Sequence, residues 1–270
     1  MAALAFFAAA SVALAFVVLP VVAIFVHVSP GTLVDQLSNP VVHDALLVTL
    51  RTSLAAQALI VLFGTSLAWL LATRRFPGRA VLVTLVELPI VLPPAVAGIG
   101  LLVAFGRFGL VGRHFGVWSA LSFDWLAVTF AVMLVAGPFY VRSAIAAFES
   151  VDGDLLAASR TLGAGPVRTF LRVALPLARS GLAAGEAISL ARGIGEFGAT
   201  IMFAGSLQGR TQTLSLAVYS EFDRNFDVAL AISALLVVIS LAILLTLKAS
   251  ALWQPYRQTS GFLSARFASR

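Results

Sequence analysis

Apolar residues fall into six long runs that are separated by shorter polar segments. The runs extend over about 4–26, 45–73, 81–105, 125–147, 182–204 and 228–246. Several exceed the roughly 20 residues that a helix needs to cross the hydrocarbon core of a bilayer. The pattern predicts an all-α membrane protein with six transmembrane helices in a single domain over residues 1–270. The first run has no basic residue ahead of it and is longer than a signal-peptide core, so we expect it to remain as an uncleaved span.

The longest polar interruption lies between the fourth and fifth runs, at residues 148–181. It contains Arg160, Arg168, Arg172 and Arg179 and no lysine. A helical pattern stops at Gly163, where glycine permits a left-handed turn, restarts after Pro166 and ends at Leu175-Pro176. The pattern predicts a polar helix–turn–helix, held between two apolar helices, that a partner outside the membrane binds.

The third and fifth runs carry features that are unusual in lipid. Pro89, Pro93 and Pro94 lie in the third run, where prolines free backbone carbonyls that must then find protein or water. Two interpretations stay open for this run, a kinked and tightly packed helix or a helix that lines a water-accessible path.

Four ionisable residues lie inside the predicted spans and should each face protein or water and have a partner. They are Glu87, Glu186, Arg192 and Glu196. Arg192 and Glu196 are four residues apart, so they share a helix face and can pair directly. This pair is either structural or part of a substrate site.

Small residues recur every four positions in and near the fifth run. Such faces allow membrane helices to approach closely. Within this stretch the small residues are Gly181, Gly185, Ala191, Gly195 and Ala199. The spacing fits both a dimer interface and packing within one subunit.

The composition narrows the chemistry. The chain is 60% hydrophobic and only 11% charged, whereas soluble domains are about 25% charged. It has no cysteine, which excludes disulfides and thiolate sites, and His27, His43 and His114 show no metal-ligand clustering. The single lysine, Lys248, does not follow a glycine-rich phosphate-binding loop, so any ATP that the protein uses must bind to another subunit.

The basic residues predict the orientation and explain the net charge of +6 better than nucleic-acid binding does. Cytoplasmic loops of membrane proteins are enriched in arginine and lysine. The loops after the second, fourth and sixth runs hold Arg74, Arg75, Arg79, Arg142, Arg160, Arg168, Arg172, Arg179, Lys248, Arg257, Arg266 and Arg270, and the opposite loops hold Arg107, Arg113, Arg210 and Arg224. We therefore expect residues 148–181 and both termini to face the cytoplasm.

Residues 157–163 read Ala-Ala-Ser-Arg-Thr-Leu-Gly, and residues 173–176, after nine intervening positions, read Val-Ala-Leu-Pro. This arrangement resembles the cytoplasmic EAA loop of the permeases of binding-protein-dependent ABC importers, a short helix on which an ATPase subunit docks. Ala158, Gly163, Leu175 and Pro176 match that pattern at its spacing.

The loop departs from the family pattern at its first position, where Ala157 replaces glutamate, and also has Ser159 for alanine and Val173 for isoleucine. Docking is therefore expected to depend more on shape and on neighbouring arginines than on a carboxylate. The resemblance implies a coupling site formed by Ala157, Ala158, Ser159, Arg160, Leu162, Gly163, Ala164, Leu175 and Pro176.

Residues 195–205 and 209–214, together with 88–98 and 105–107, resemble the branch of these permeases that transports molybdate or tungstate. Sulfate permeases have a related Gly-Glu-aromatic-Gly segment, so sulfate or thiosulfate remains open as substrate. The resemblance implies cytoplasmic ATPase subunits that bind ATP and magnesium, an extracytoplasmic oxyanion-binding protein, a homodimer of permeases and a location in the inner membrane. The chain itself is expected to bind no cofactor.

Carboxylates near a path for an anion would repel it, which fits a permease whose binding protein supplies the affinity. Backbone amides, Ser189 and Thr200 would line such a path better than glutamates. The candidate path or gate residues are Pro93, Pro94, Ser189, Glu196 and Thr200.

Two other classes of membrane protein were weighed. A secondary transporter would be expected to show internal inverted repeats, and the pattern at 157–176 has no second copy. An intramembrane enzyme would need a catalytic pair, and none is recognisable, so the chain is expected not to be an enzyme.

Overall fold

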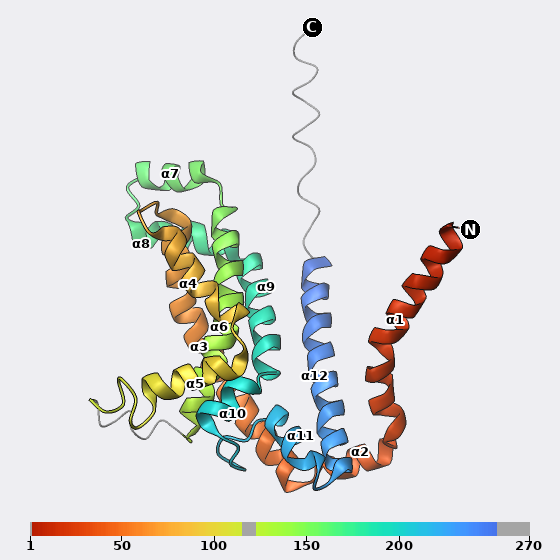
Figure 1. Cartoon of the computed structure of the whole chain (residues 1–270). Coiled ribbons are helices and arrows are strands. Elements are labelled where there is room, and N and C mark those ends of the chain that lie inside the picture. The colour runs from red at the N-terminus through yellow and green to blue at the C-terminus, as the bar shows by residue number, and fades with distance from the viewer. Residues whose placement is uncertain (1, 115–122, 253–270) are drawn as a thin grey trace.

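The computed structural model describes residues 2–114 and 123–252, and over these residues its regular structure is helical (Figure 1). The helices are α1 (Ala2–His27), α2 (Pro30–Leu37), α3 (Pro40–Thr73), α4 (Arg79–Val91), α5 (Pro94–Phe105), α6 (Trp125–Glu149), α7 (Gly153–Thr161), α8 (Pro166–Thr169), η2 (Phe170–Ala174), α9 (Leu175–Ile194), α10 (Gly198–Ala204), α11 (Leu214–Phe222) and α12 (Phe226–Leu252). The all-α prediction is confirmed.

The core is a bundle in which α6 packs between α3 and α9. One side of α9 is formed by small residues, and added β-carbons there would meet α6 directly. A Cβ at Gly181 would lie 2.5 Å from the Cβ of Ala147, and one at Gly185 would lie 2.7 Å from the Cβ of Ser143. Gly181 and Gly185 therefore pack against α6 within one subunit, as one of the two interpretations of their four-residue spacing predicts.

The predicted third span, 81–105, is not one helix. It divides into α4 and α5, which meet at an angle of 116°. Leu92 and Pro93 lie between them in extended conformation or near it, because the residue before a proline disfavours helical backbone and Pro94 then starts a new helix. In Figure 1, α4 runs along the bundle and α5 turns across it.

The predicted fifth span, 182–204, is also divided, into α9 and α10 with Gly195–Phe197 between them. The loop before it differs from the prediction as well. The helical pattern does not end at Leu175-Pro176 but continues into α9. A π-helical turn at Phe170–Ala174, in which the Leu175 N–H bonds to the Phe170 carbonyl, widens the helix just before the proline and accommodates its missing N–H.

Four described helices, α1, α3, α6 and α12, are long and apolar enough to cross a membrane, and the bent pair of α4 and α5 brings the number to five if it is one span. Helix α9 is outside this set. It carries three charged residues, Arg179, Glu186 and Arg192, within its 20 residues. The six-span prediction is therefore supported in part.

Helix α1 stands apart from the bundle, whereas α12 packs on α11 and α9. Helices α1 and α12 contact each other, and α2 joins them at the end opposite α7 (Figure 1). The first residues of α1 and the last of α12 point toward the same end of the molecule as α7. The side chain of Lys248 and the basic residues Arg257, Arg266 and Arg270 lie outside the part of the chain whose side chains the structure describes.

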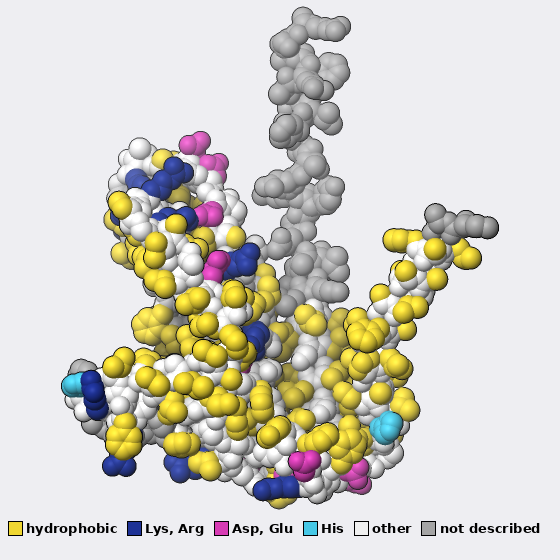
Figure 2. All heavy atoms as spheres, viewed as in Figure 1, with side chains coloured by type: hydrophobic (Ala, Val, Ile, Leu, Met, Phe, Trp, Pro, Cys, Tyr) yellow, Lys and Arg dark blue, Asp and Glu magenta, His cyan; other side chains and the backbone are white. Residues whose placement is uncertain are grey.

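Hydrophobic side chains cover most of the face shown in Figure 2, including all sides of α1 that are visible there. Charged side chains gather mainly around α7 and at the opposite end of the molecule. This distribution is the one expected of a protein whose middle lies in lipid and whose two ends meet water and head groups.

Candidate functional site

Helix α7 lies across one end of the bundle and ends in a motif that short-range chemistry explains (Figure 1). Gly163 has a φ of +82°, the left-handed conformation that glycine adopts without steric cost. Its N–H bonds to the Arg160 carbonyl, and the Ala164 N–H bonds to the Ser159 carbonyl at 3.1 Å. These two bonds form a Schellman cap, so the predicted turn at Gly163 is confirmed.

The outward side of α7 and its cap expose apolar side chains. Leu155 is 49% exposed and Leu162 is 87% exposed, and Ala158, between them on the same side of the helix, is exposed as well. An exposed apolar stripe on a short polar helix is a feature of surfaces that bind another protein. The smallness of Ala158 leaves room for a partner's surface to approach the backbone.

The opposite side of α7 is attached to the bundle. Leu156 packs against the buried core, and the Ser159 hydroxyl lies 3.0 Å from the hydroxyl of the buried Thr169 in α8. Below them, the rings of Trp69, Phe148 and Phe170 pack against one another at centroid distances of 5.2–6.0 Å. The aromatic cluster joins the end of α3, the end of α6 and the chain that returns from α7.

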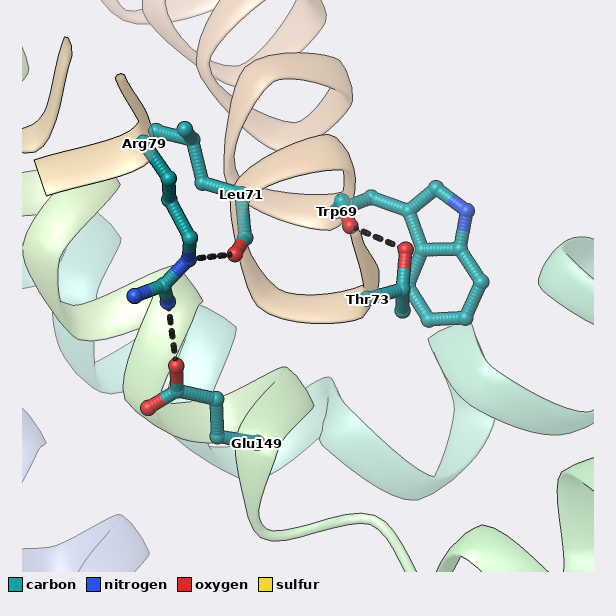
Figure 3. Close-up of polar contacts among 5 residues, drawn as sticks. All are labelled: Trp69, Leu71, Thr73, Arg79 and Glu149. Carbon is teal, nitrogen blue, oxygen red and sulfur yellow. Dashed lines mark hydrogen bonds and ion pairs between the residues drawn. The ribbon is translucent and has the colours of Figure 1, made fainter. Parts of the chain in front are cut away.

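An ion pair holds the turn between α3 and α4 to the end of α6 (Figure 3). The Arg79 guanidinium donates from Nε to the Leu71 carbonyl at 2.6 Å and contacts the Glu149 carboxylate at 2.7 Å. Ala157, at the family's glutamate position, is exposed and lines the same hollow as Arg79 and Glu149. The carboxylate that lines that hollow, Glu149, therefore comes from α6 rather than from α7.

Of the remaining predicted coupling residues, Leu175 and Pro176 are the first two residues of α9, which follows α8 and η2 in the sequence. They are not part of the exposed α7 surface. Their contribution in the structure is to start α9 after the π-helical turn.

Inside the bundle, Ser189 lies at a contact between three helices. It is fully buried, and its hydroxyl lies 3.1 Å from Oε1 of Gln57 in α3 and 3.0 Å from the Ala136 carbonyl in α6. The Gln57 Nε2 is buried without a hydrogen-bond acceptor among the described residues. This arrangement ties α9 to both of its neighbours.

Gln57 was not singled out from the sequence. It belongs to a buried polar side of α3 formed by Thr49, Thr52, Ser53 and Gln57. The spacing of three and four residues between these polar positions is the signal in the sequence that could have pointed to Gln57. The Thr49 hydroxyl accepts a bond from the Leu214 N–H at 2.8 Å, so this side of α3 also contacts the start of α11.

Glu196 lies at the break between α9 and α10 and is 2% exposed. Its carboxylate accepts a bond from the Ala199 N–H at 2.8 Å and pairs with Arg192 at 2.8 Å. Its carbonyl accepts the Ser215 hydroxyl at 2.6 Å. Glu196 thus caps α10 and links α9, α10 and α11, and the predicted pairing of Arg192 with Glu196 is present.

The other path candidates lie next to this junction. Pro94 starts α5 where α10 begins, and a Cβ at Gly198 would lie 2.8 Å from the Pro94 Cβ. Thr200 is fully buried, with no hydrogen-bond partner for its hydroxyl in the described part of the chain. The structure brings Pro94, Glu196 and Thr200 together. Pro93 lies at the bend before Pro94, and both prolines are exposed. Ser189 lies at the separate contact with Gln57.

The remaining ionisable residues of the spans differ in their surroundings. Glu87 in α4 lies 3.7 Å from Arg142 in α6, and Glu186 lines a hollow in the bundle together with Arg179, Tyr140 and Thr65. Across the described residues, no group of three or more acidic or histidine side chains could hold a metal ion.

Comparison with known proteins gives a consistent picture. Residues 60–253 match the model of a family described as binding-protein-dependent transport system inner membrane component. The molybdenum transport system permease protein ModB of Mycobacterium bovis is 41% identical over 233 residues, which cover 85% of this chain and 88% of that protein. ModB of Escherichia coli is 40% identical over 179 residues, covering 66% and 78%.

A sulfate permease and two solved structures are also similar. The sulfate transport system permease protein CysT of Salmonella typhimurium is 35% identical over 217 residues, covering 79% of this chain and 78% of that protein. The crystal structure of a bacterial ABC transporter that imports the acidic polysaccharide alginate has a TM-score of 0.60 at 18% identity, with 84% and 85% of the chains covered. An inward-facing structure of the MetNI methionine ABC transporter has a TM-score of 0.57 at 20% identity, covering 83% and 99%. These two structures share the fold.

Proposed function

Because this chain belongs to the family of binding-protein-dependent transport system inner membrane components, we propose that it is the membrane-spanning subunit of an ATP-driven importer of molybdate or tungstate. It resides in the cytoplasmic membrane and moves its anion between a binding protein on the outer side and the cytoplasm. The observation that carries the proposal is the 41% identity to a molybdenum permease over 85% of the chain.

Sulfate is the second candidate substrate. Sulfate and molybdate are both tetrahedral dianions, and the sulfate permease CysT is 35% identical over 79% of the chain. Molybdate is favoured because the molybdenum permeases of three genera are 40–43% identical.

Energy comes from separate ATPase subunits that bind ATP and magnesium, and this sequence has no phosphate-binding loop of its own. They dock on α7 from the cytoplasm, with Ala158 and Gly163 at the contact. The exposed stripe of Leu155, Ala158 and Leu162 supports this surface. The ends of α1 and α12 point the same way as α7, which supports cytoplasmic termini.

Two copies of the permease form the pathway around a two-fold axis, the commonest symmetry of protein dimers. Closure of the ATPases moves α7 and turns the pathway outward, where the binding protein releases its anion. Hydrolysis resets it inward. The attachment of α7 to α3 and α6 through Trp69, Phe148 and Phe170 supports a rigid link between the docking surface and the bundle.

The pathway is lined by neutral groups near Pro94 and Thr200, where α5 and α10 meet. Glu196 acts as a positioning residue that fixes the bend between α9 and α10. Its carboxylate is already engaged by Arg192 and by the Ala199 N–H, which supports a role in holding the path rather than in binding an anion.

The test is uptake of labelled molybdate, tungstate and sulfate into proteoliposomes that contain this chain, its candidate ATPase and its binding protein. ATP-dependent uptake of molybdate or tungstate above that of sulfate is expected. Uptake of sulfate alone would replace the substrate assignment, and uptake without ATP would contradict the transporter class.

The docking role of α7 is tested in the same vesicles by Gly163→Asp. A carboxylate at this exposed turn should enter the ATPase contact and lower uptake by at least about tenfold, since about 1.4 kcal/mol of lost coupling suffices. Gly78→Asp is the matched control, because Gly78 has a similar φ of +87° and the same open surroundings but lies off α7. Normal coupling in Gly163→Asp would show that the docking surface lies elsewhere.

A further inference from the structure

A hollow lies between the bundle-facing side of α7 and the ends of α3 and α6. Its charged lining residues are Arg75, Arg79, Glu149 and Arg160. Three guanidinium groups and one carboxylate thus meet in a space that opens to solvent beside the predicted membrane surface. Figure 2 shows basic side chains gathered on this end of the molecule.

The single carboxylate of this hollow is neutralised. Arg79 pairs with Glu149 at 2.7 Å, and its Nε donates a hydrogen bond to the Leu71 carbonyl at 2.6 Å (Figure 3). The guanidinium groups of Arg75 and Arg160 have no hydrogen bond or ion pair to any described residue. The hollow therefore carries an excess of two positive charges.

Arg160 is shared with a second, adjacent hollow, where it lies with Arg74. Thr73 lines both hollows, but its hydroxyl donates to the Trp69 carbonyl at 2.7 Å (Figure 3). The cationic hydrogen-bond donors that line the two hollows are therefore guanidinium groups. Cations held this close to one another repel, and an anion between them would relieve that repulsion.

The frame around the hollow is preorganised. The rings of Trp69, Phe148 and Phe170 pack beneath it, and the Ser159–Thr169 contact fixes α7 against α8. An anion that binds here does not have to order α7 first. Binding therefore avoids the loss of conformational entropy that occurs when a flexible basic loop becomes ordered around a ligand.

We infer that Arg75 and Arg160 form a binding site for a tetrahedral oxyanion between α7 and the turn after α3. Guanidinium groups match such oxygens with paired N–H donors. The oxyanion is either the phosphate of an acidic lipid head group, which clusters of arginine next to a membrane helix attract, or a free oxyanion in solution.

An acidic side chain of a docked protein fits the hollow less well. The hollow faces the bundle, whereas the exposed apolar stripe of α7, Leu155 to Leu162, faces outward. The inference concerns this chain alone and goes beyond the transport function, so its failure would leave the proposed function standing.

The experiment uses the full-length chain in phosphatidylcholine nanodiscs. The thermal midpoint of unfolding is followed with phosphatidylglycerol included in one arm and with inorganic phosphate or sulfate added in another. A rise in midpoint is expected in at least one arm. In the double variant Arg75→Gln/Arg160→Gln, the affinity derived from that rise should fall by at least about tenfold, the effect of losing one charge-assisted hydrogen bond.

The matched control is Arg168→Gln/Arg172→Gln, which removes the same charge from exposed residues that line neither hollow. It should retain the rise. A response to phosphatidylglycerol alone identifies a lipid site, and a response to free phosphate or sulfate identifies a solution anion. No rise in either arm, or an equal loss in both double variants, would overturn the inference. The inference would also be overturned if Arg75→Gln/Arg160→Gln left the rise in midpoint unchanged and weakened ATPase binding instead. The two arginines would then belong to the contact with that partner.

Discussion

Two arginine–glutamate pairs of nearly equal length place their carboxylates in opposite surroundings. Arg79–Glu149 is 2.7 Å long, with side chains 33% and 48% exposed, whereas Arg192–Glu196 is 2.8 Å long, with side chains 31% and 1% exposed. The first pair connects the turn after α3 to α6 beside α7. The second lies at the break between α9 and α10. Equal geometry therefore does not imply equal importance, because exposed pairs contribute little and buried pairs are costly to break.

The largest difference should come from breaking the buried pair on one side only. Arg192→Met would leave the Glu196 carboxylate buried, with a hydrogen bond from the backbone N–H of Ala199 but without its cation. The expected cost is about 3–5 kcal/mol in the free energy of unfolding. Denaturant titration in detergent measures this loss.

Removing both charges provides the control for that experiment. Arg192→Met/Glu196→Gln keeps an acceptor for the Ala199 N–H and leaves no unpaired buried charge. It should therefore be more stable than Arg192→Met alone. If the double variant were equally or less stable, the penalty would not come from an isolated carboxylate.

A smaller loss is expected where the same region depends on close packing instead of charge. Gly185→Val would force a side chain against Ser143, whose Cβ already lies 2.7 Å from where a Cβ at position 185 would be, and overpacking costs about 1–3 kcal/mol. The same titration applies. Ala184→Val on the exposed side of α9 should change stability little, and an equal effect there would contradict the assigned packing of Gly185 on α6.

The smallest effect should come from the exposed pair. Glu149→Gln should cost about 1 kcal/mol or less, because Arg79 keeps its bond to the Leu71 carbonyl. The difference from the unaltered protein should shrink as salt is raised, since exposed charges are screened. A loss as large as that of Arg192→Met would remove the distinction between the two pairs.

The two regions also differ in how far the sequence predicts them. The turn at Gly163 follows from neighbouring residues, since a glycine after a short helix favours a left-handed cap, and the structure has it. The four-residue spacing of Gly181 and Gly185 likewise predicts close packing, although α6 as the partner required the structure.

The break between α9 and α10 is not readable in this way. Residues 182–204 form one apolar run, and what divides it is tertiary. Glu196 caps α10 while Ser215, from the chain beyond, bonds to its carbonyl. Similarly, Pro93 and Pro94 indicate a kink, but neither the 116° angle nor the close approach of Pro94 to Gly198 can be read from them. The role of Gln57 also needs its partner Ser189, 132 positions away.

The isolation of α1 has a consequence for the order in which the protein is made. Its neighbour α12 is the last described helix, so α1 leaves the ribosome long before the surface it packs on exists. Over Leu4–His27 its hydropathy is 2.8, and its most apolar stretch buries nothing inside the protein. A helix without a charged or buried face can remain surrounded by lipid at little cost in free energy. Helices α3, α6 and α9 can therefore assemble before α1 packs against α12.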